Sequence, residues 1–180
     1  CYFGAGNLHF VQQPDQSRAN LGGQRAGGPG QIVAAGSLAA LAALAENPPE
    51  GSRVRALAVS GAFHTTTMVP AVSHLAALAA SLTATDPKAP FISNKDGAVI
   101  ENGREILDRI VVQIAGPVRW DLCMQTLAQD GVTGAVEVAP AGTLVGLIKR
   151  AVPGIEQFAL KSPADIEAAR TFATAHSEAR

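Results

Sequence analysis

The stretch SGAFHTTTM, at residues 60–68, contains residue types that acid–base catalysis uses. It follows an apolar, strand-like run and places His64 after a single aromatic residue and before three threonines. In parallel α/β sheets, ligands and reactive groups gather where strands end and helices begin, and Gly61 permits an unusual turn at that junction. A neutral imidazole serves as a general base near neutral pH. His64 is therefore the first candidate catalytic residue, and an ordinary surface or core histidine is the alternative.

A second candidate lies at the end of the amphipathic segment REILDRIVVQIAG, residues 104–116. Its apolar spacing predicts a helix that stops at the Gly116-Pro117 pair. The predicted apolar face contains Ile106, Leu107, Ile110, Val111 and Ile114. The last four carbonyls of a helix have no partner within the helix. If the helix ends near Ala115, the Gln113 carbonyl could accept the Nδ1 proton of a histidine and fix its tautomer, as a carboxylate does in a catalytic triad. An ordinary frayed helix end is the alternative.

A nucleophile for this histidine is missing from the sequence. None of the nine serines lies in a G-x-S-x-G elbow. Cys123 lies beside Leu122 in a predicted helix, a position more typical of a core residue than of a reactive thiol. Catalysis by His64 would therefore need a nucleophile from outside this chain.

Composition and motifs exclude several other classes of protein. The 180 residues are 47% apolar and 16% charged with a net charge of -1, so neither disorder nor nucleic-acid binding is expected. Two cysteines give no zinc spacing and fit a reducing compartment such as the cytoplasm. No apolar run is long enough for a membrane span. The glycine-rich segments GAGN and GGPGQ match no nucleotide-binding loop, so we expect no cofactor and no metal.

The order of predicted elements indicates an α/β fold. Residues 1–30 are rich in Gly, Gln and Asn without a sustained period, and are predicted to be irregular. Strands are predicted at 31–36, 53–59, 89–94, 134–140 and 155–160, and helices at 37–47, 68–82, 104–116, 120–128, 142–150 and 162–176. Because strands and helices alternate, we expect a mostly parallel sheet.

Five segments between Gly28 and Arg150 resemble one enzyme family. They are GPGQIVAAGS, RVRALAVSGAFHTTTMVPAV, DPKAPFISNKDG, QIAGPVRWDLCMQTL and VEVAPAGTLVGLIKR. Together they resemble the C-terminal part of malonyl-CoA:acyl-carrier-protein transacylases, most closely the actinobacterial form. The resemblance implies an α/β-hydrolase-like acyltransferase large subdomain with a partial parallel sheet, plus an incomplete ferredoxin-like small subdomain. It divides the chain into a poorly matching segment 1–30, a small-subdomain remnant 31–60 and a large-subdomain part 61–180.

The resemblance also implies an activity and site residues. The family transfers malonyl groups from malonyl-CoA to the phosphopantetheine thiol of acyl carrier protein in fatty acid biosynthesis, through an acyl-serine. Its catalytic histidine falls on His64, and its histidine-orienting backbone carbonyl falls on Gln113. Phe63 corresponds to a bulky residue that narrows the acyl pocket for malonyl rather than methylmalonyl groups. The serine elbow would precede residue 1, so we expect the chain alone to be inactive.

Two alternative interpretations are also compatible with the sequence. The chain could be a truncated relic that at most binds carrier protein. It could also be a fragment of a malonyl-selective acyltransferase domain from a polyketide synthase, although no flanking ketosynthase or carrier sequence is present. An in-frame G-H-S-x-G elbow in the DNA upstream would favour the transacylase over the relic.

Overall fold

The computed structural model describes residues 8–12, 23–24, 31–35, 37–57 and 62–177. Its contacts divide the chain into two compact units, Cys1–Cys123 and Met124–Arg180. The predicted boundaries at residues 30 and 60 concern subdomains of the family and stay predictions. No helix in the described ranges has the length and apolar content to cross a membrane.

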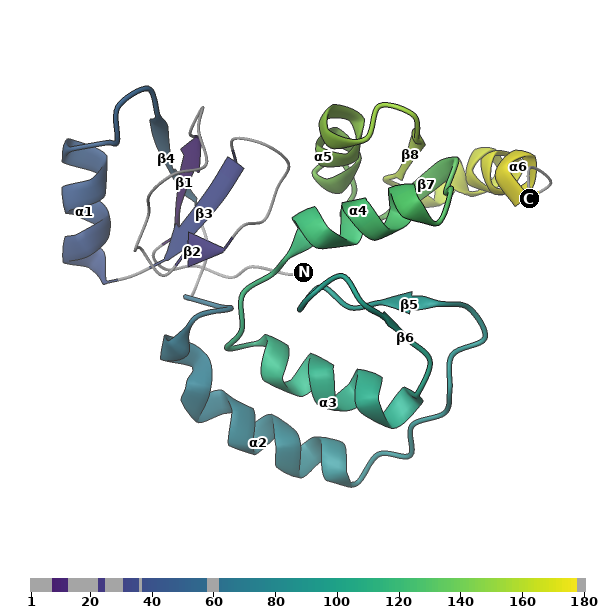
Figure 1. Cartoon of the computed structure of the whole chain (residues 1–180), viewed down its shortest axis with the longest axis horizontal. Coiled ribbons are helices and arrows are strands. Elements are labelled where there is room, and N and C mark those ends of the chain that lie inside the picture. The colour runs from purple at the N-terminus through teal and green to yellow at the C-terminus, as the bar shows by residue number, and fades with distance from the viewer. Residues whose placement is uncertain (1–7, 13–22, 25–30, 36, 58–61, 178–180) are drawn as a thin grey trace. The chain divides into compact units, whose positions relative to one another are not determined.

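The first unit holds a small sheet and a helical pair (Figure 1). Its elements are β1 (Leu8–Gln12), β2 (Gly23–Gln24), β3 (Gln31–Ala35), α1 (Leu38–Glu46), β4 (Arg53–Leu57), the 3₁₀ turn η1 (Thr66–Met68), α2 (Val69–Ala80), β5 (Phe91–Ile92), β6 (Val99–Ile100) and α3 (Gly103–Gln113). The helix α4 (Trp120–Gln129) crosses the boundary between the units.

The first sheet is antiparallel, in the order β2-β3-β1-β4. The helix predicted from residue 37 begins there, because the Ser37 hydroxyl caps α1 by accepting a hydrogen bond from the Ala40 amide at 3.2 Å. Leu44 of α1 packs with Ala34 and Val54 of the sheet and so covers one face of it. Strands β1 and β2 lie within residues 1–30, so the prediction that this segment is irregular was wrong for its described part. It failed because these strands are defined by long-range pairing rather than by a local apolar period.

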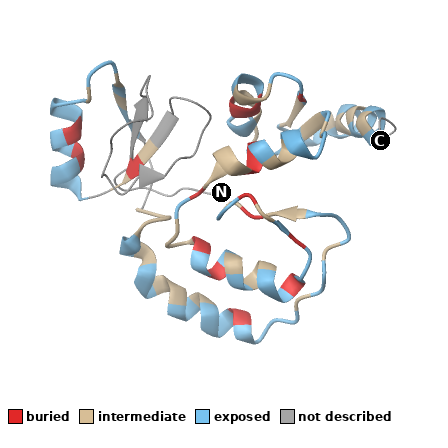
Figure 2. Ribbon diagram, in the orientation of Figure 1, coloured by how far each residue is buried: buried red, intermediate tan, exposed pale blue. Residues whose placement is uncertain are grey.

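The helices α2 and α3 pack against each other in opposite directions (Figure 1). At one end of the pair, Arg104 at the start of α3 donates to the Ala79 carbonyl at the end of α2. Asn102 caps α3 by accepting from the Glu105 amide at 2.9 Å. The predicted apolar face of α3 is partly wrong, since Ile110 is 55% exposed whereas Val111 is buried. Figure 2 shows buried, intermediate and exposed parts along this helix.

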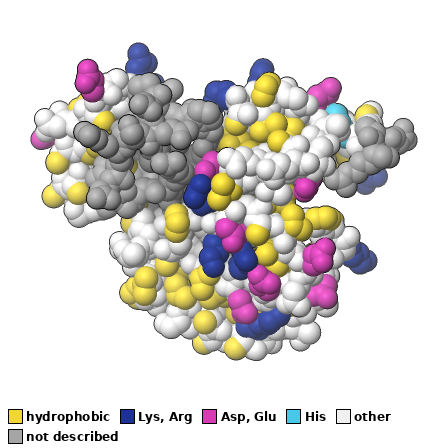
Figure 3. Space-filling model, viewed as in Figure 1, with side chains coloured by type: hydrophobic (Ala, Val, Ile, Leu, Met, Phe, Trp, Pro, Cys, Tyr) yellow, Lys and Arg dark blue, Asp and Glu magenta, His cyan; other side chains and the backbone are white. Residues whose placement is uncertain are grey.

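Charged side chains cover the outer surface around α3. Arg109 contacts both Asp96 and Glu105 at 2.9 Å, and Figure 3 shows basic and acidic side chains next to one another on this face. Such exposed pairs stabilise a fold by at most about 1 kcal/mol each. They therefore mark a solvated face and leave the opposite side of α3 to pack on α2.

The second unit contains the parallel pairing that the sequence predicts. Strands β7 (Gly134–Val138) and β8 (Glu156–Leu160) are parallel and are joined through α5 (Leu144–Ala151). The 3₁₀ turn η2 (Pro163–Asp165) leads into α6 (Ile166–Ser177), whose Phe172 ring lies 5.7 Å from that of Phe158. All other strand pairings among the described residues are antiparallel, so a mostly parallel sheet was the wrong expectation.

Glu137 of β7 binds the start of α5. Its carboxylate accepts hydrogen bonds from the backbone amides of Gly142, Leu144 and Val145 at 2.8 to 3.0 Å. Partial burial by itself raises the pKa of Glu137, but the bonds from these amides favour the anion and lower the pKa below its ordinary value of 4.5. The charge also complements the positive end of the helix dipole.

This contact predicts an acid-sensitive contribution to stability. A carboxyl whose pKa is lower in the folded state stabilises the fold above its unfolded pKa, and the effect disappears as pH falls through the folded value. We expect Glu137→Gln to lower the free energy of unfolding at pH 7 by about 1–2 kcal/mol. The difference should shrink below pH 4.5. Urea unfolding followed by circular dichroism at pH 7 and in acid measures it, with Glu101→Gln, at an exposed position, as control. A difference that does not change with pH would contradict this role.

Candidate active site

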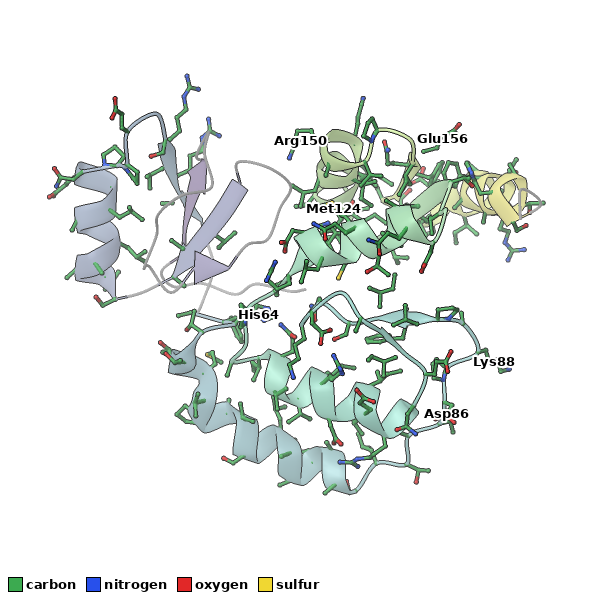
Figure 4. All side chains as sticks on the ribbon, viewed as in Figure 1. His64, Asp86, Lys88, Met124, Arg150 and Glu156 are labelled. Carbon is green, nitrogen blue, oxygen red and sulfur yellow. The ribbon has the colours of Figure 1, made fainter. Side chains whose placement is uncertain are left out.

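His64 lies in a tight turn that leads into η1 and α2 (Figure 4). The Thr65 hydroxyl donates to the Ala62 carbonyl at 2.6 Å and closes the turn. His64 itself has a φ of 63°, the left-handed region that side chains with a Cβ rarely adopt. Such a conformation costs on the order of 1–3 kcal/mol and persists only where surrounding contacts impose it. The strain indicates that the direction of this side chain is fixed by the fold.

Two carbonyls at the end of α3 impose that conformation. The backbone amide of His64 donates to the Ile114 carbonyl at 2.6 Å. The ring Nδ1 lies 2.8 Å from the Gln113 carbonyl oxygen. Because a carbonyl oxygen can only accept, Nδ1 carries the proton of this bond. In the neutral ring, the lone pair is then on Nε2, which is the nitrogen that a general base needs.

The Gln113 carbonyl is available because α3 ends at this residue. Ile114 is the C-cap, and the Gln113 oxygen also accepts a hydrogen bond from the Gly116 amide at 3.2 Å. The helix thus ends two residues before the predicted end at Ala115. The structure brings the two predicted catalytic residues together, whereas their roles in catalysis stay predictions.

Two further residues of the predicted turn are Phe63 and Gly61. Phe63 is partly buried directly before His64, and its role in an acyl pocket stays a prediction. The hinge expected at Gly61 lies outside the described residues.

The side chain of Gln113 is a feature that the sequence reasoning missed. It is only 8% exposed, and its amide nitrogen donates to the carbonyls of Gly116 and Pro117 at 3.2 and 2.9 Å. The helix-end argument from the sequence concerns only the main-chain carbonyl of this residue. The available signal was a glutamine three residues before a Gly-Pro pair, since Pro lacks the amide with which a backbone could close the helix end.

Cys123 is a core residue, as its position in a predicted helix indicates. Its side chain is 2% exposed and its Sγ lies 3.5 Å from the Ser93 carbonyl. Burial, together with the nearby charges of Asp121 and Asp96, raises the pKa of the thiol to about 11. Within the described ranges, no group of three or more His, Cys, Asp or Glu side chains is placed to hold a metal ion.

The sequence of the chain is similar to those of known proteins. No family model matches the chain. A malonyl CoA-acyl carrier protein transacylase of Mycobacterium tuberculosis is 51% identical over 138 residues, which are 77% of this chain and 46% of that protein. The enzyme of the same name from Mycolicibacterium smegmatis is 48% identical over 142 residues, 77% of this chain and 49% of that protein. The chain is homologous to the malonyl CoA-acyl carrier protein transacylases.

The fold agrees with this relationship. The crystal structure of the Mycobacterium tuberculosis transacylase superposes with a TM-score of 0.84 at 44% identity, covering 90% of this chain and 56% of that one. The chain therefore has part of the α/β acyltransferase fold of these transacylases. It spans about half the length of the curated relatives that it matches.

The buried thiol gives a test of this part of the fold. With a pKa near 11 instead of its ordinary value of 9.0, the Cys123 thiolate is about 100-fold scarcer at neutral pH. We expect iodoacetamide to label Cys123 at least that much more slowly in the folded chain than in urea. Peptide mapping by mass spectrometry separates it from Cys1. Equal labelling rates in both states would show that this core is not formed.

Proposed function

We propose that this chain supplies the histidine-bearing part of a malonyl-CoA:acyl carrier protein transacylase. The observation that carries the proposal is the bond between His64 Nδ1 and the Gln113 carbonyl oxygen at 2.8 Å. It leaves Nε2 as the proton acceptor and holds the ring in one orientation. The identity to the mycobacterial transacylases supports the choice of reaction.

In the first half-reaction, His64 acts as base and then as acid. A serine from the part of the enzyme outside this chain attacks the thioester carbonyl of malonyl-CoA while Nε2 takes its hydroxyl proton. The carbon–sulfur bond breaks, and the protonated ring gives that proton to the departing thiolate. The Gln113 carbonyl stabilises the imidazolium that exists between these two transfers.

The second half-reaction reverses these roles. His64 takes the proton of the phosphopantetheine thiol on acyl carrier protein, and the resulting sulfur nucleophile attacks the malonyl ester. As the ester bond breaks, Nε2 returns the proton to the serine oxygen. The ring thus starts and ends each turnover neutral, with the proton on Nδ1 unchanged throughout.

We also propose the partners of the reaction, the process to which it belongs and where it takes place. Malonyl-CoA and acyl carrier protein are the partners, and fatty acid biosynthesis in the cytoplasm is the process. No metal or cofactor takes part in the steps assigned to His64. Since none of the serines in the sequence lies in a nucleophile elbow, the isolated chain is inactive.

A chimera tests the proposal with this chain's own residues. The chain replaces the matching part of the Mycobacterium tuberculosis transacylase, and malonyl transfer to acyl carrier protein is measured. We expect the chimera to be active and His64→Ala to lower its kcat by about 10²–10⁴, the usual contribution of general acid–base catalysis.

Two controls accompany this measurement. His74→Ala replaces an exposed histidine of α2 and should leave turnover unchanged. The isolated chain should transfer no malonyl group. A folded chimera without activity would favour the relic, and a loss of under about tenfold in His64→Ala would rule out the assigned role.

Phe63 provides a separate prediction on acyl-group selection. If its ring narrows the pocket, Phe63→Ala should admit the extra methyl group of methylmalonyl-CoA. We expect the ratio of kcat/KM for methylmalonyl-CoA to that for malonyl-CoA to rise at least about tenfold in the chimera. One methyl group in an apolar pocket usually changes substrate discrimination by about this factor or more. Phe91→Ala, in β5, is the matched control. An unchanged ratio would exclude Phe63 from the pocket.

A further inference from the structure

We propose that the side-chain amide of Gln113 is a positioning group for His64, acting through the carbonyl of its own residue. The inference rests on the proposed function for its chemical consequence, because only a catalytic histidine needs a fixed tautomer. It assigns to the Gln113 side chain a role separate from that of its main-chain oxygen.

A set of hydrogen bonds at the end of α3 all involve Gln113. From the last helical residue, the amide nitrogen of Gln113 reaches the carbonyls of Gly116 and Pro117. The Gly116 amide returns to the Gln113 oxygen at 3.2 Å. The same oxygen receives the His64 ring. One residue therefore holds the exiting chain with its side chain and the imidazole with its backbone.

The sequence after α3 explains why a side chain is needed here. Helix ends usually turn through amide donors of the residues that follow. Pro117 has no amide, so the backbone cannot supply a donor at that position. Gln113 supplies two N–H donors instead, and its burial removes competition from water. Without them, the carbonyls of Gly116 and Pro117 would lose these partners, and the turn would lose the support of a buried side chain.

The direction of the Gln113 carbonyl depends on that turn. If the chain from Gly116 relaxes, the Gly116 amide no longer holds the oxygen in line with His64 Nδ1. A ring without this acceptor distributes its proton between Nδ1 and Nε2, and the population with Nε2 protonated cannot accept the serine proton at Nε2. Loss of the side chain should thus change the histidine and not only the stability of the helix.

Nitrogen NMR of the histidine rings in the full 180-residue chain tests this directly. In the wild-type chain, neutral His64 should be in the Nδ1–H tautomer. Gln113→Met keeps the size of the side chain but removes both donors. Gln113→Glu keeps the shape and replaces the donors with acceptors. We expect the Nε2–H tautomer of His64 to become at least as populated as the Nδ1–H form in both variants.

Gln125→Met is the matched control, because Gln125 is an exposed glutamine of α4. Its His64 tautomer should equal that of the wild type. A purely structural role of Gln113 would lower the unfolding midpoint and leave the tautomer unchanged, which would overturn the inference.

If the Gln113 variants do not fold, a second measurement on the wild-type chain tests the same inference. The two side-chain amide protons of Gln113 should exchange with solvent at least about tenfold more slowly than those of Gln125, since both donate in a buried site. Equal exchange rates would overturn the inference. Neither measurement involves malonyl transfer. An inactive chimera would therefore contradict the proposed function without changing the conclusion about the Gln113 side chain.

Discussion

The hydrogen bond from the His64 ring to the Gln113 carbonyl joins two segments 49 residues apart. It exists because α2 and α3 run in opposite directions, so the turn before α2 meets the end of α3. At the other end of the pair, Arg104 bonds the Ala79 carbonyl. These two contacts join the helices at both ends, and the strained backbone of His64 persists because the contacts around it impose that conformation.

The arrangement uses a helix terminus where many hydrolases use a carboxylate. A backbone carbonyl cannot take up a proton, so it orients the imidazole and stabilises its charged form without competing for the proton. The helix dipole places partial negative charge at the same end. A buried glutamine amide completes the terminus, which makes the site depend on the local sequence from Gln113 to Pro117.

Local signals in the sequence predicted most of the elements and the two residues of the site. The helical segments predicted from residues 37 and 162 begin at the caps Ser37 and Ser162, because caps are local interactions. The family resemblance assigned His64 and the Gln113 carbonyl to one site. The sequence did not predict β1, whose pairing with β3 and β4 is long-range, nor the positive φ of His64, which tertiary contacts impose. The second role of Gln113 was missed since it depends on how the chain leaves the helix.

A helix terminus holds His64, and we propose that Nε2 then faces a serine from the rest of the enzyme. A crystal structure of the chimera tests it most directly. We predict that His64 Nε2 lies within about 2.6–3.2 Å of the serine Oγ, with Nδ1 still bonded to the Gln113 carbonyl. A ring turned away from the serine, or a Gln113 carbonyl that has left Nδ1, would contradict the account.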